Sequence, residues 1–160
     1  MGKYIENGLR IAPPEAPVSG YMFGKGVYFA DSSSKSANYC YANEEEPDGL
    51  LVLCDVALGL PYKRLEAQYE AKSKSKKKGC DSTWGVGQSA PLEHVTMPDG
   101  GILPCGQVVA NDAAIQDAKL DWPRGKPTLL YNEYIVYRES QVQMKYIVHV
   151  KFEFLKGTKK

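Results

Sequence analysis

Apolar and polar residues alternate without a break near the end of the chain, from Val142 to Phe154. A period of two is typical of a strand with one buried face. The preceding run, Leu129–Tyr137, is rich in aromatic and β-branched residues and predicts a second strand, with Glu133 and Ile135 on one face. Only a short segment separates the two runs, so the pattern predicts that they form a hairpin.

The first part of the chain predicts a loop, a short strand and a helix. Three prolines within Gly8–Gly20 disfavour both helix and strand, so an ordered loop is expected there. Gly24–Ala30 is typical of a glycine-led turn that enters a short strand. Asp31 and Ser32 can then cap a helix that runs to about Tyr41.

The middle of the chain has a weaker pattern. The apolar run Leu50–Leu58 predicts a buried strand. From about Pro61 to Lys126 the periodicity fails, and we expect short hairpins and long loops. The prediction is therefore one domain over residues 1–160, of the α+β class, with mostly antiparallel β-sheets and a few helices.

Composition narrows the classes of function. The net charge of +1 gives no overall basic excess of the kind that nucleic-acid binding requires. The four cysteines include no C-x-x-C pair and no Cys/His grouping, so we expect no metal site and a reducing compartment. No apolar run reaches the length of a signal core or a membrane span, so no membrane partner is expected.

Glu133 is the most informative single residue, because burying a carboxylate in a strand is unfavourable unless the charge is paired. Two interpretations remain open from the residues alone. Glu133 is either an exposed charge on the strand surface or a functional carboxylate.

Other candidate groups give weaker signals. We interpret His94, in an expected loop, and His149, on the polar face of the last strand, as surface residues, which leaves a catalytic histidine without support. Gly24–Gly26 matches neither a P-loop nor the full dinucleotide fingerprint. The lysine-rich run Lys72–Lys78 is either a solvated loop, which we favour, or a nuclear-localisation or polyanion-binding patch.

Tyrosine is abundant, with 11 residues in the chain. An aromatic face can stack on a flat heteroaromatic ring while its hydroxyl stays hydrogen-bonded, although core packing is the commoner use of any one tyrosine. The constellation of interest combines two aromatic faces, a hydroxyl and a carboxylate: Tyr28, Tyr39, Ser36 and Glu133.

Four motifs carry a resemblance to a known family. They are GLRIAPPEAP (Gly8–Pro17), GYMFGKGVYFAD (Gly20–Asp31), SKSANYC (Ser34–Cys40) and LYNEYIVY (Leu130–Tyr137). In this order they resemble the catalytic domain of the poly(ADP-ribose) polymerases, specifically the DNA-dependent branch. The similarity runs through nearly the whole chain and is weakest between about Tyr62 and Lys126. It implies an ADP-ribosyltransferase-like fold with NAD held in a cleft between two sheets.

The resemblance also implies a reaction. The family cleaves the bond between nicotinamide and ribose in NAD and transfers ADP-ribose to a protein acceptor or to a growing poly(ADP-ribose) chain. Glu133 is then the catalytic carboxylate, because a preplaced negative charge stabilises an oxocarbenium-like transition state. The implied setting is nuclear and concerned with DNA repair, with DNA contacted only through domains outside this chain.

Residues around Glu133 take places at the nicotinamide end of NAD by the same resemblance. Tyr39 stacks on the nicotinamide ring and Ser36 bonds its carboxamide. Tyr28 packs against the nicotinamide ribose, as one member of the family's His-Tyr-Glu triad. Lys35 lies close to the catalytic glutamate, so Glu133, Tyr28 and Lys35 form the expected catalytic set.

The resemblance places other residues farther along NAD. Gly8 and Arg10 lie near the adenosine end. Tyr21 and Met22 border the donor or acceptor site. Residues 9–20 correspond to the donor loop that covers NAD.

The four motifs do not include the family's His-Gly pair. The family's His-Gly pair, which holds the adenosine ribose and the carboxamide, lies upstream of the segment where this chain begins, and neither His94 nor His149 matches it by position. We therefore expect the chain to be the C-terminal part of the catalytic domain, from a longer protein or a truncated gene product, with reduced NAD affinity and turnover by itself. The alternative function is a catalytically impaired NAD-binding or interaction module.

Overall fold

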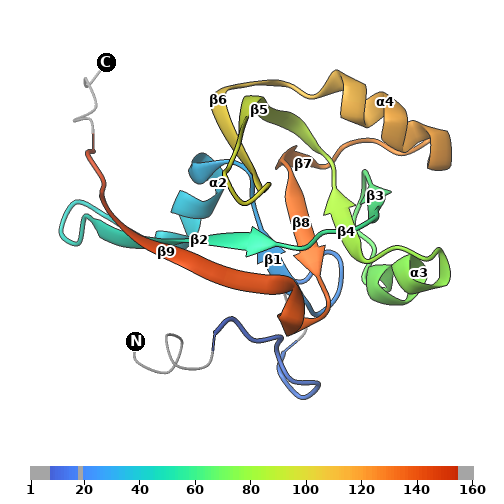
Figure 1. The fold of residues 1–160 in the computed structure, drawn as a ribbon, viewed down its shortest axis with the longest axis horizontal. Coiled ribbons are helices and arrows are strands. Elements are labelled where there is room, and N and C mark those ends of the chain that lie inside the picture. The colour runs from blue at the N-terminus through green and yellow to red at the C-terminus, as the bar shows by residue number, and fades with distance from the viewer. Residues whose placement is uncertain (1–7, 18–19, 155–160) are drawn as a thin grey trace.

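Three small sheets make up the structure, which is a computed structural model that describes residues 8–17 and 20–154 (Figure 1). The four-stranded sheet has the order β1-β8-β4-β3. Its strands are β1 (Val27–Phe29), β8 (Glu133–Val136), β4 (Ser82–Gly85) and β3 (Pro61–Arg64). β8 pairs antiparallel with both β1 and β4, and the β3–β4 pair is parallel.

The other two sheets flank this one. β2 (Asp48–Val56) pairs antiparallel with β9 (Val142–Lys151) in a two-stranded ribbon. β5 (Gly87–Thr96) pairs antiparallel with β6 (Ile102–Ala110) and parallel with β7 (Leu129–Tyr131). The α+β class with mostly antiparallel sheets is therefore confirmed.

Short helices lie between the strands. They are α2 (Ser33–Ala37), α3 (Ala71–Lys77), α4 (Asp112–Asp121) and the single 3-10 turns Asn38–Cys40 and Glu139–Gln141. α3 lies beside β3 and β4, and α4 lies beside β3 and the start of the β5–β6 hairpin (Figure 1). None of the described helices is long and apolar enough to span a bilayer.

Two hydrophobic clusters hold the four-stranded sheet in place. The first consists of Phe23, Ala71, Ile135 and Tyr137, with Met22, Tyr28 and Leu129 packed against it. The second consists of Leu65, Val86, Ile115 and Ala118, with Trp84 and Ala114 packed against it. The first cluster lies next to the candidate site, because it contains Ile135 of β8 and the ring of Tyr28 from β1.

Several predicted elements of the first part are confirmed. No helix or strand occurs in the described residues of the proline-rich loop, 8–17 and 20, whereas Val18 and Ser19 lie outside the described residues. The short strand is β1, and the helix is α2 continued by a 3-10 turn to Cys40. Ser32 is its N-cap residue, but its side chain makes no capping hydrogen bond.

The predicted strand Leu129–Tyr137 is divided in two. β7 belongs to one sheet and β8 to another, and Asn132 lies between them. The side chain of Asn132 is buried and accepts a hydrogen bond from the backbone N–H of Gly87 at 2.9 Å. A Cβ on Gly87 would lie 2.2 Å from the backbone of Tyr131, so glycine is required for this close approach.

The predicted hairpin between β8 and β9 is wrong. β9 pairs with β2 instead, because Gln141 redirects the chain toward the end of β2. The Gln141 carbonyl accepts from Ala57 N, and its side-chain amide donates to the carbonyls of Ala57 and Asp81, all at 2.8 to 3.2 Å.

Two other predictions are also wrong. Leu50–Leu58 does form most of a strand, but β2 is not buried, and Leu50, Val52 and Leu53 are each about 40% exposed. Residues 61–126 hold two helices and a long hairpin rather than mainly loops, and His94 lies within β5. The run from Lys72 to Lys77 is helical and Lys78 caps the helix, because the small residues Ala71 and Ser75 bury one side of α3.

Candidate active site

Glu133 begins β8, and its side chain is largely buried, with 8% of the residue exposed. The interpretation as an exposed strand charge is therefore wrong. The facing residue on β4 is Gly85, where a Cβ would lie 2.6 Å from the ring of Phe23. The missing side chain at Gly85 lets Phe23 pack directly behind the start of β8, which fixes the backbone that carries the carboxylate.

Lys35 supplies the charge that compensates Glu133. Its Nζ lies 3.0 Å from Glu133 Oε1, and the two side chains are only 12% and 10% exposed. The same ammonium lies 3.5 and 3.4 Å from the carbonyl oxygens of Tyr131 and Asn132. A buried ion pair is strongly destabilised when one partner is removed, so Lys35 offsets the cost of burying the Glu133 carboxylate.

Asn132 anchors the backbone just before Glu133. Its Nδ2 donates to Asp31 Oδ2 at 2.6 Å, and its Oδ1 accepts from Gly87 N and from Asn111 Nδ2 at 2.9 and 3.1 Å. Both acceptor positions and one of the two donors of this side chain are therefore used. The network links segments that are distant in sequence and holds the division between β7 and β8 in one geometry.

Asp31 is the charged end of this network. Its Oδ2 also accepts from the Tyr134 hydroxyl at 3.3 Å, while its Oδ1 is buried without a partner among the described residues. Burial raises the pKa of Asp31, against the lowering effects of its bonds to Asn132 and Tyr134 and of the nearby charge of Lys35. The ring of Tyr134 stacks on Trp84 at 5.5 Å, which fixes its hydroxyl toward Asp31.

Tyr28 lies on the neighbouring strand. It pairs with Ile135, two residues beyond Glu133, and directly paired residues share a sheet face, so its ring and the Glu133 side chain lie on the same face. The Tyr28 hydroxyl donates to Gly24 O at 2.7 Å and accepts from Phe23 N at 3.1 Å. Burial raises the pKa of Tyr28, and the nearby Glu133 carboxylate contributes to the increase. Tyr28 is thus a neutral, fixed ring at the edge of the site.

Ser36 and Tyr39 come from the segment that also carries Lys35. Ser36 lies in α2 and is partly buried, whereas Tyr39 lies in the following 3-10 turn and is 66% exposed. A free aromatic face close to Lys35 in sequence is what stacking on a flat ring requires. Tyr21 lies beside Tyr28, with ring centroids 6.1 Å apart.

Two sets of contacts fix the proline-rich loop to the rest of the domain. Arg10 pairs with Glu139 at 2.7 Å, and the backbone N–H of Ile11 donates to the same carboxylate at 2.9 Å. Lys25 donates to the carbonyls of Pro13, Pro14 and Ala16 at 2.5 to 2.8 Å. A hollow of about 500 Å³ lies between this loop and the start of α3 and is lined by Lys25, among others, but not by Glu133.

The structure brings together only part of the expected set. Glu133 and Lys35 are in contact, Tyr28 lies on the same face, and Tyr21 lies against Tyr28. Arg10 lies apart, at Glu139, and Gly8 begins the described chain with a φ of +68°. Sequence reasoning missed Asp31, Asn111 and Asn132 as site residues, and the signal that could have found Asn132 is an amide in the middle of an apolar strand run.

The histidines and cysteines take no part in this site. His149 pairs with Asp48 at 2.8 Å on the exposed β2–β9 ribbon, and His94 is exposed on β5. All four cysteines are free. Among residues 8–17 and 20–154, no group of His, Cys, Asp and Glu side chains could hold a metal ion.

The sequence matches a known family model along nearly its full length. The model described as "Poly(ADP-ribose) polymerase catalytic domain" matches residues 1–152. This range includes every residue of the network around Glu133.

Individual proteins give the same result. The chain is 50% identical over 154 residues to "Poly [ADP-ribose] polymerase 2-A" of Oryza sativa subsp. japonica, covering 95% of this chain and 21% of that protein. It is 50% identical to "Poly [ADP-ribose] polymerase 2" of Arabidopsis thaliana and 49% identical to "Poly [ADP-ribose] polymerase 2" of Homo sapiens, covering 94% of this chain in each case and 22% and 24% of those proteins. The chain thus spans about a fifth to a quarter of the length of these relatives.

Proposed function

Because the chain belongs to the poly(ADP-ribose) polymerase catalytic domain family, we propose that it transfers ADP-ribose from NAD to protein acceptors or to growing poly(ADP-ribose), and releases nicotinamide. The observation that carries the proposal is the buried Glu133 carboxylate, held at 3.0 Å by Lys35 and placed on the same sheet face as Tyr28. A charged group in this setting is costly to maintain and is typical of a functional site.

Glu133 has two roles in the proposed reaction. As the bond between nicotinamide and the ribose C1′ breaks, its electron pair leaves with nicotinamide and positive charge develops on the ribose. The Glu133 carboxylate stabilises this charge electrostatically. The oxygen of the acceptor hydroxyl then bonds to C1′, and its proton passes to the carboxylate as general base.

The other site residues position the substrate and the carboxylate. Tyr39 offers an exposed aromatic face for nicotinamide, and Ser36, three residues earlier, offers a hydroxyl for the carboxamide. Lys35 and the Asn132 network fix the position of the Glu133 carboxylate, which we assign to contact the nicotinamide ribose. We assign Gly8, Arg10 and Tyr21 to the NAD-binding surface on the strength of the family motif alone.

Incubation with NAD labelled in the adenine ring tests this function. Covalent label in protein after denaturing wash supports the transferase. Binding of labelled NAD without covalent incorporation supports the alternative, an impaired NAD-binding module.

We propose a nuclear location and a role in DNA repair, which follow from the resemblance to the DNA-dependent branch. The same resemblance assigns DNA contact to segments other than this domain. A fluorescent fusion of the natural protein, imaged before and after DNA damage, tests this part. A diffuse cytoplasmic signal that does not change would contradict it.

A further inference from the structure

α3 and the residue that follows it form a basic surface that the proposed reaction does not use. We call it the basic helix: Lys72, Lys74, Lys76, Lys77 and Lys78. These five are a quarter of the 20 lysines and arginines in the chain, and the remaining 15 are outnumbered by the 19 acidic residues. The positive charge of the domain is thus concentrated at one place.

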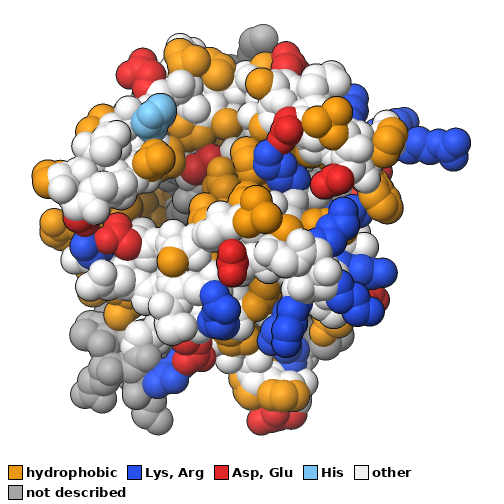
Figure 2. Space-filling view, turned by 45° about the vertical axis from the view of Figure 1, so that its right-hand side comes forward, with side chains coloured by type: hydrophobic (Ala, Val, Ile, Leu, Met, Phe, Trp, Pro, Cys, Tyr) orange, Lys and Arg blue, Asp and Glu red, His pale blue; other side chains and the backbone are white. Residues whose placement is uncertain are grey.

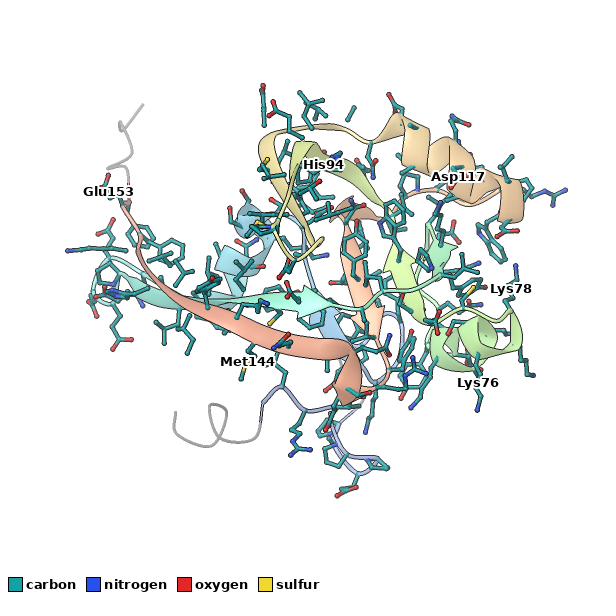
Figure 3. The ribbon with its side chains drawn as sticks, in the orientation of Figure 1. Lys76, Lys78, His94, Asp117, Met144 and Glu153 are labelled. Atoms are coloured by element: carbon teal, nitrogen blue, oxygen red, sulfur yellow. The ribbon has the colours of Figure 1, made fainter. Side chains whose placement is uncertain are left out.

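The basic helix is a fixed platform rather than a solvated loop. Ala71 and Ser75 are buried at 0% and 1% exposure, so the lysines all lie on the outer side. Cys80 N donates to Ser75 O and Gly79 N donates to Lys76 O, which is the Schellman pattern, with Gly79 at a φ of +72°. Lys76 extends from α3 into solvent (Figure 3), whereas Lys78 follows the helix and its Nζ lies 5.4 Å from the centroid of the Tyr62 ring.

Most of this charge has no acidic partner among the residues that the structure describes. Lys78 lies 3.7 Å from Asp121, and the other four lysines form no salt bridge within residues 8–17 and 20–154. Lys72 and Lys76, like Lys74 and Lys78, are four residues apart, and like charges at this spacing destabilise a helix. Figure 2 is turned so that the α3 side of Figure 1 comes forward, and Lys and Arg side chains gather toward the right of that view. An anionic partner would relieve this repulsion.

The basic helix is also joined to the candidate site. Ala71, the first residue of α3, belongs to the buried cluster that contains Phe23 and Ile135. The ring of Tyr28 packs against the same cluster. Gln68 N donates to Met22 O at 2.8 Å, just before the helix. Lys72 lines the hollow beside the proline-rich loop. These contacts fix α3 to the core that also supports β8, the strand that begins with Glu133.

We propose that the basic helix binds poly(ADP-ribose), the product of the reaction proposed above, on which this inference rests. Each unit of that polymer carries a pyrophosphate, so the chain is a polyanion whose charge is complementary to the exposed lysines of the basic helix. Binding at the helix would hold the growing chain, or an already modified acceptor, close to the Glu133 site.

Equilibrium binding of end-labelled, purified poly(ADP-ribose), measured by anisotropy without NAD, tests the proposal. The test variant is Lys74→Gln with Lys76→Gln and Lys77→Gln. The control variant is Arg124→Gln with Lys126→Gln and Lys151→Gln, which removes the same charge from other exposed positions. Thermal unfolding of both variants confirms the fold.

The helix variant is expected to bind polymer about tenfold or more weakly, and its slope of log affinity against log salt to fall by about two, whereas the control keeps affinity within about twofold. Equal losses in the two variants, no saturable binding by the unmodified protein, or equally tight binding of duplex DNA with matched phosphates would overturn the proposal. A protein that binds polymer but transfers no ADP-ribose would contradict only the proposed function.

Discussion

Asn132 donates a hydrogen bond to Asp31 across 2.6 Å, although 101 positions separate the two residues in sequence. Asn132 immediately precedes Glu133, and Asp31 immediately precedes the segment that carries Lys35. The bond therefore ties together the two backbones that present the ion pair of the site. Its strength determines how closely the Glu133 carboxylate keeps its position.

Exchanging the two side chains tests this role. Asn132→Asp would place two carboxylates at hydrogen-bond distance, and we expect kcat to fall about 100-fold with little change in the KM for NAD, because small displacements of catalytic groups have effects of this size. Combining it with Asp31→Asn restores one donor and one acceptor and should recover most of kcat. Parallel losses of kcat, KM and folded fraction, with no recovery in the double variant, would show a merely structural role.

The pH dependence of stability should report Asp31. Its folded-state pKa is raised, mainly by burial, above the ordinary unfolded value of about 3.9. A raised carboxyl pKa contributes stability that is fully present below the unfolded pKa and is lost as pH rises through the folded pKa. Relative to Asp31→Asn, the unmodified protein should therefore lose stability as the pH rises above about 4. Urea unfolding of both proteins across this range measures the difference, and parallel curves would refute it.

Removing Lys35 should leave a nearly buried carboxylate uncompensated. Lys35→Met is expected to destabilise the fold by about 3 kcal/mol, since breaking a buried pair from one side is costly. Adding Glu133→Gln to Lys35→Met removes the unpaired charge and should restore part of that loss. Chemical denaturation of the two single variants and the double variant completes the cycle, and additive effects would indicate that the residues do not interact.

Lys25 should control the proline-rich loop, because it donates to three of its carbonyls. Lys25→Met is expected to loosen the loop and raise the KM for NAD about fivefold with kcat nearly unchanged, as ordering the loop would then oppose binding. Lys126→Met, at an exposed position, is the matched control. Faster proteolysis within the loop should accompany the change, and equal KM values for the two variants would contradict the role.

Sequence predicts the local elements well where one residue class dominates. The glycine-led β1 and its following helix appear as expected, and the last alternating run forms the strand β9. The run Leu129–Tyr137 is instead divided between β7 and β8, which belong to different sheets. Pairing could not be predicted, because the partner of β9 is decided by Gln141, whose amide bonds residues in two other segments. The helix at Lys72–Lys78 was missed for a similar reason, since only contacts with the core reveal that Ala71 and Ser75 are its buried side.

Prediction of the candidate site from the sequence is limited in the same way, because part of it depends on contacts between distant segments. The resemblance places Glu133, Lys35 and Tyr28 together, and the structure puts Lys35 against the carboxylate and Tyr28 on the same sheet face. Asp31 and Asn111 act only through distant hydrogen bonds, which no spacing in the sequence reveals.

The most direct test of the account is the rate of ADP-ribose transfer by Glu133→Gln. The amide keeps the size of the side chain but loses the negative charge that stabilises the ribose cation and accepts the proton. We expect transfer from labelled NAD to fall at least about 100-fold while NAD binding stays close to that of the unmodified protein. Thermal unfolding should shift to a lower temperature, because Lys35 loses its partner, and the rates are compared where both proteins are folded. Transfer by Glu133→Gln at the unmodified rate would contradict the central claim.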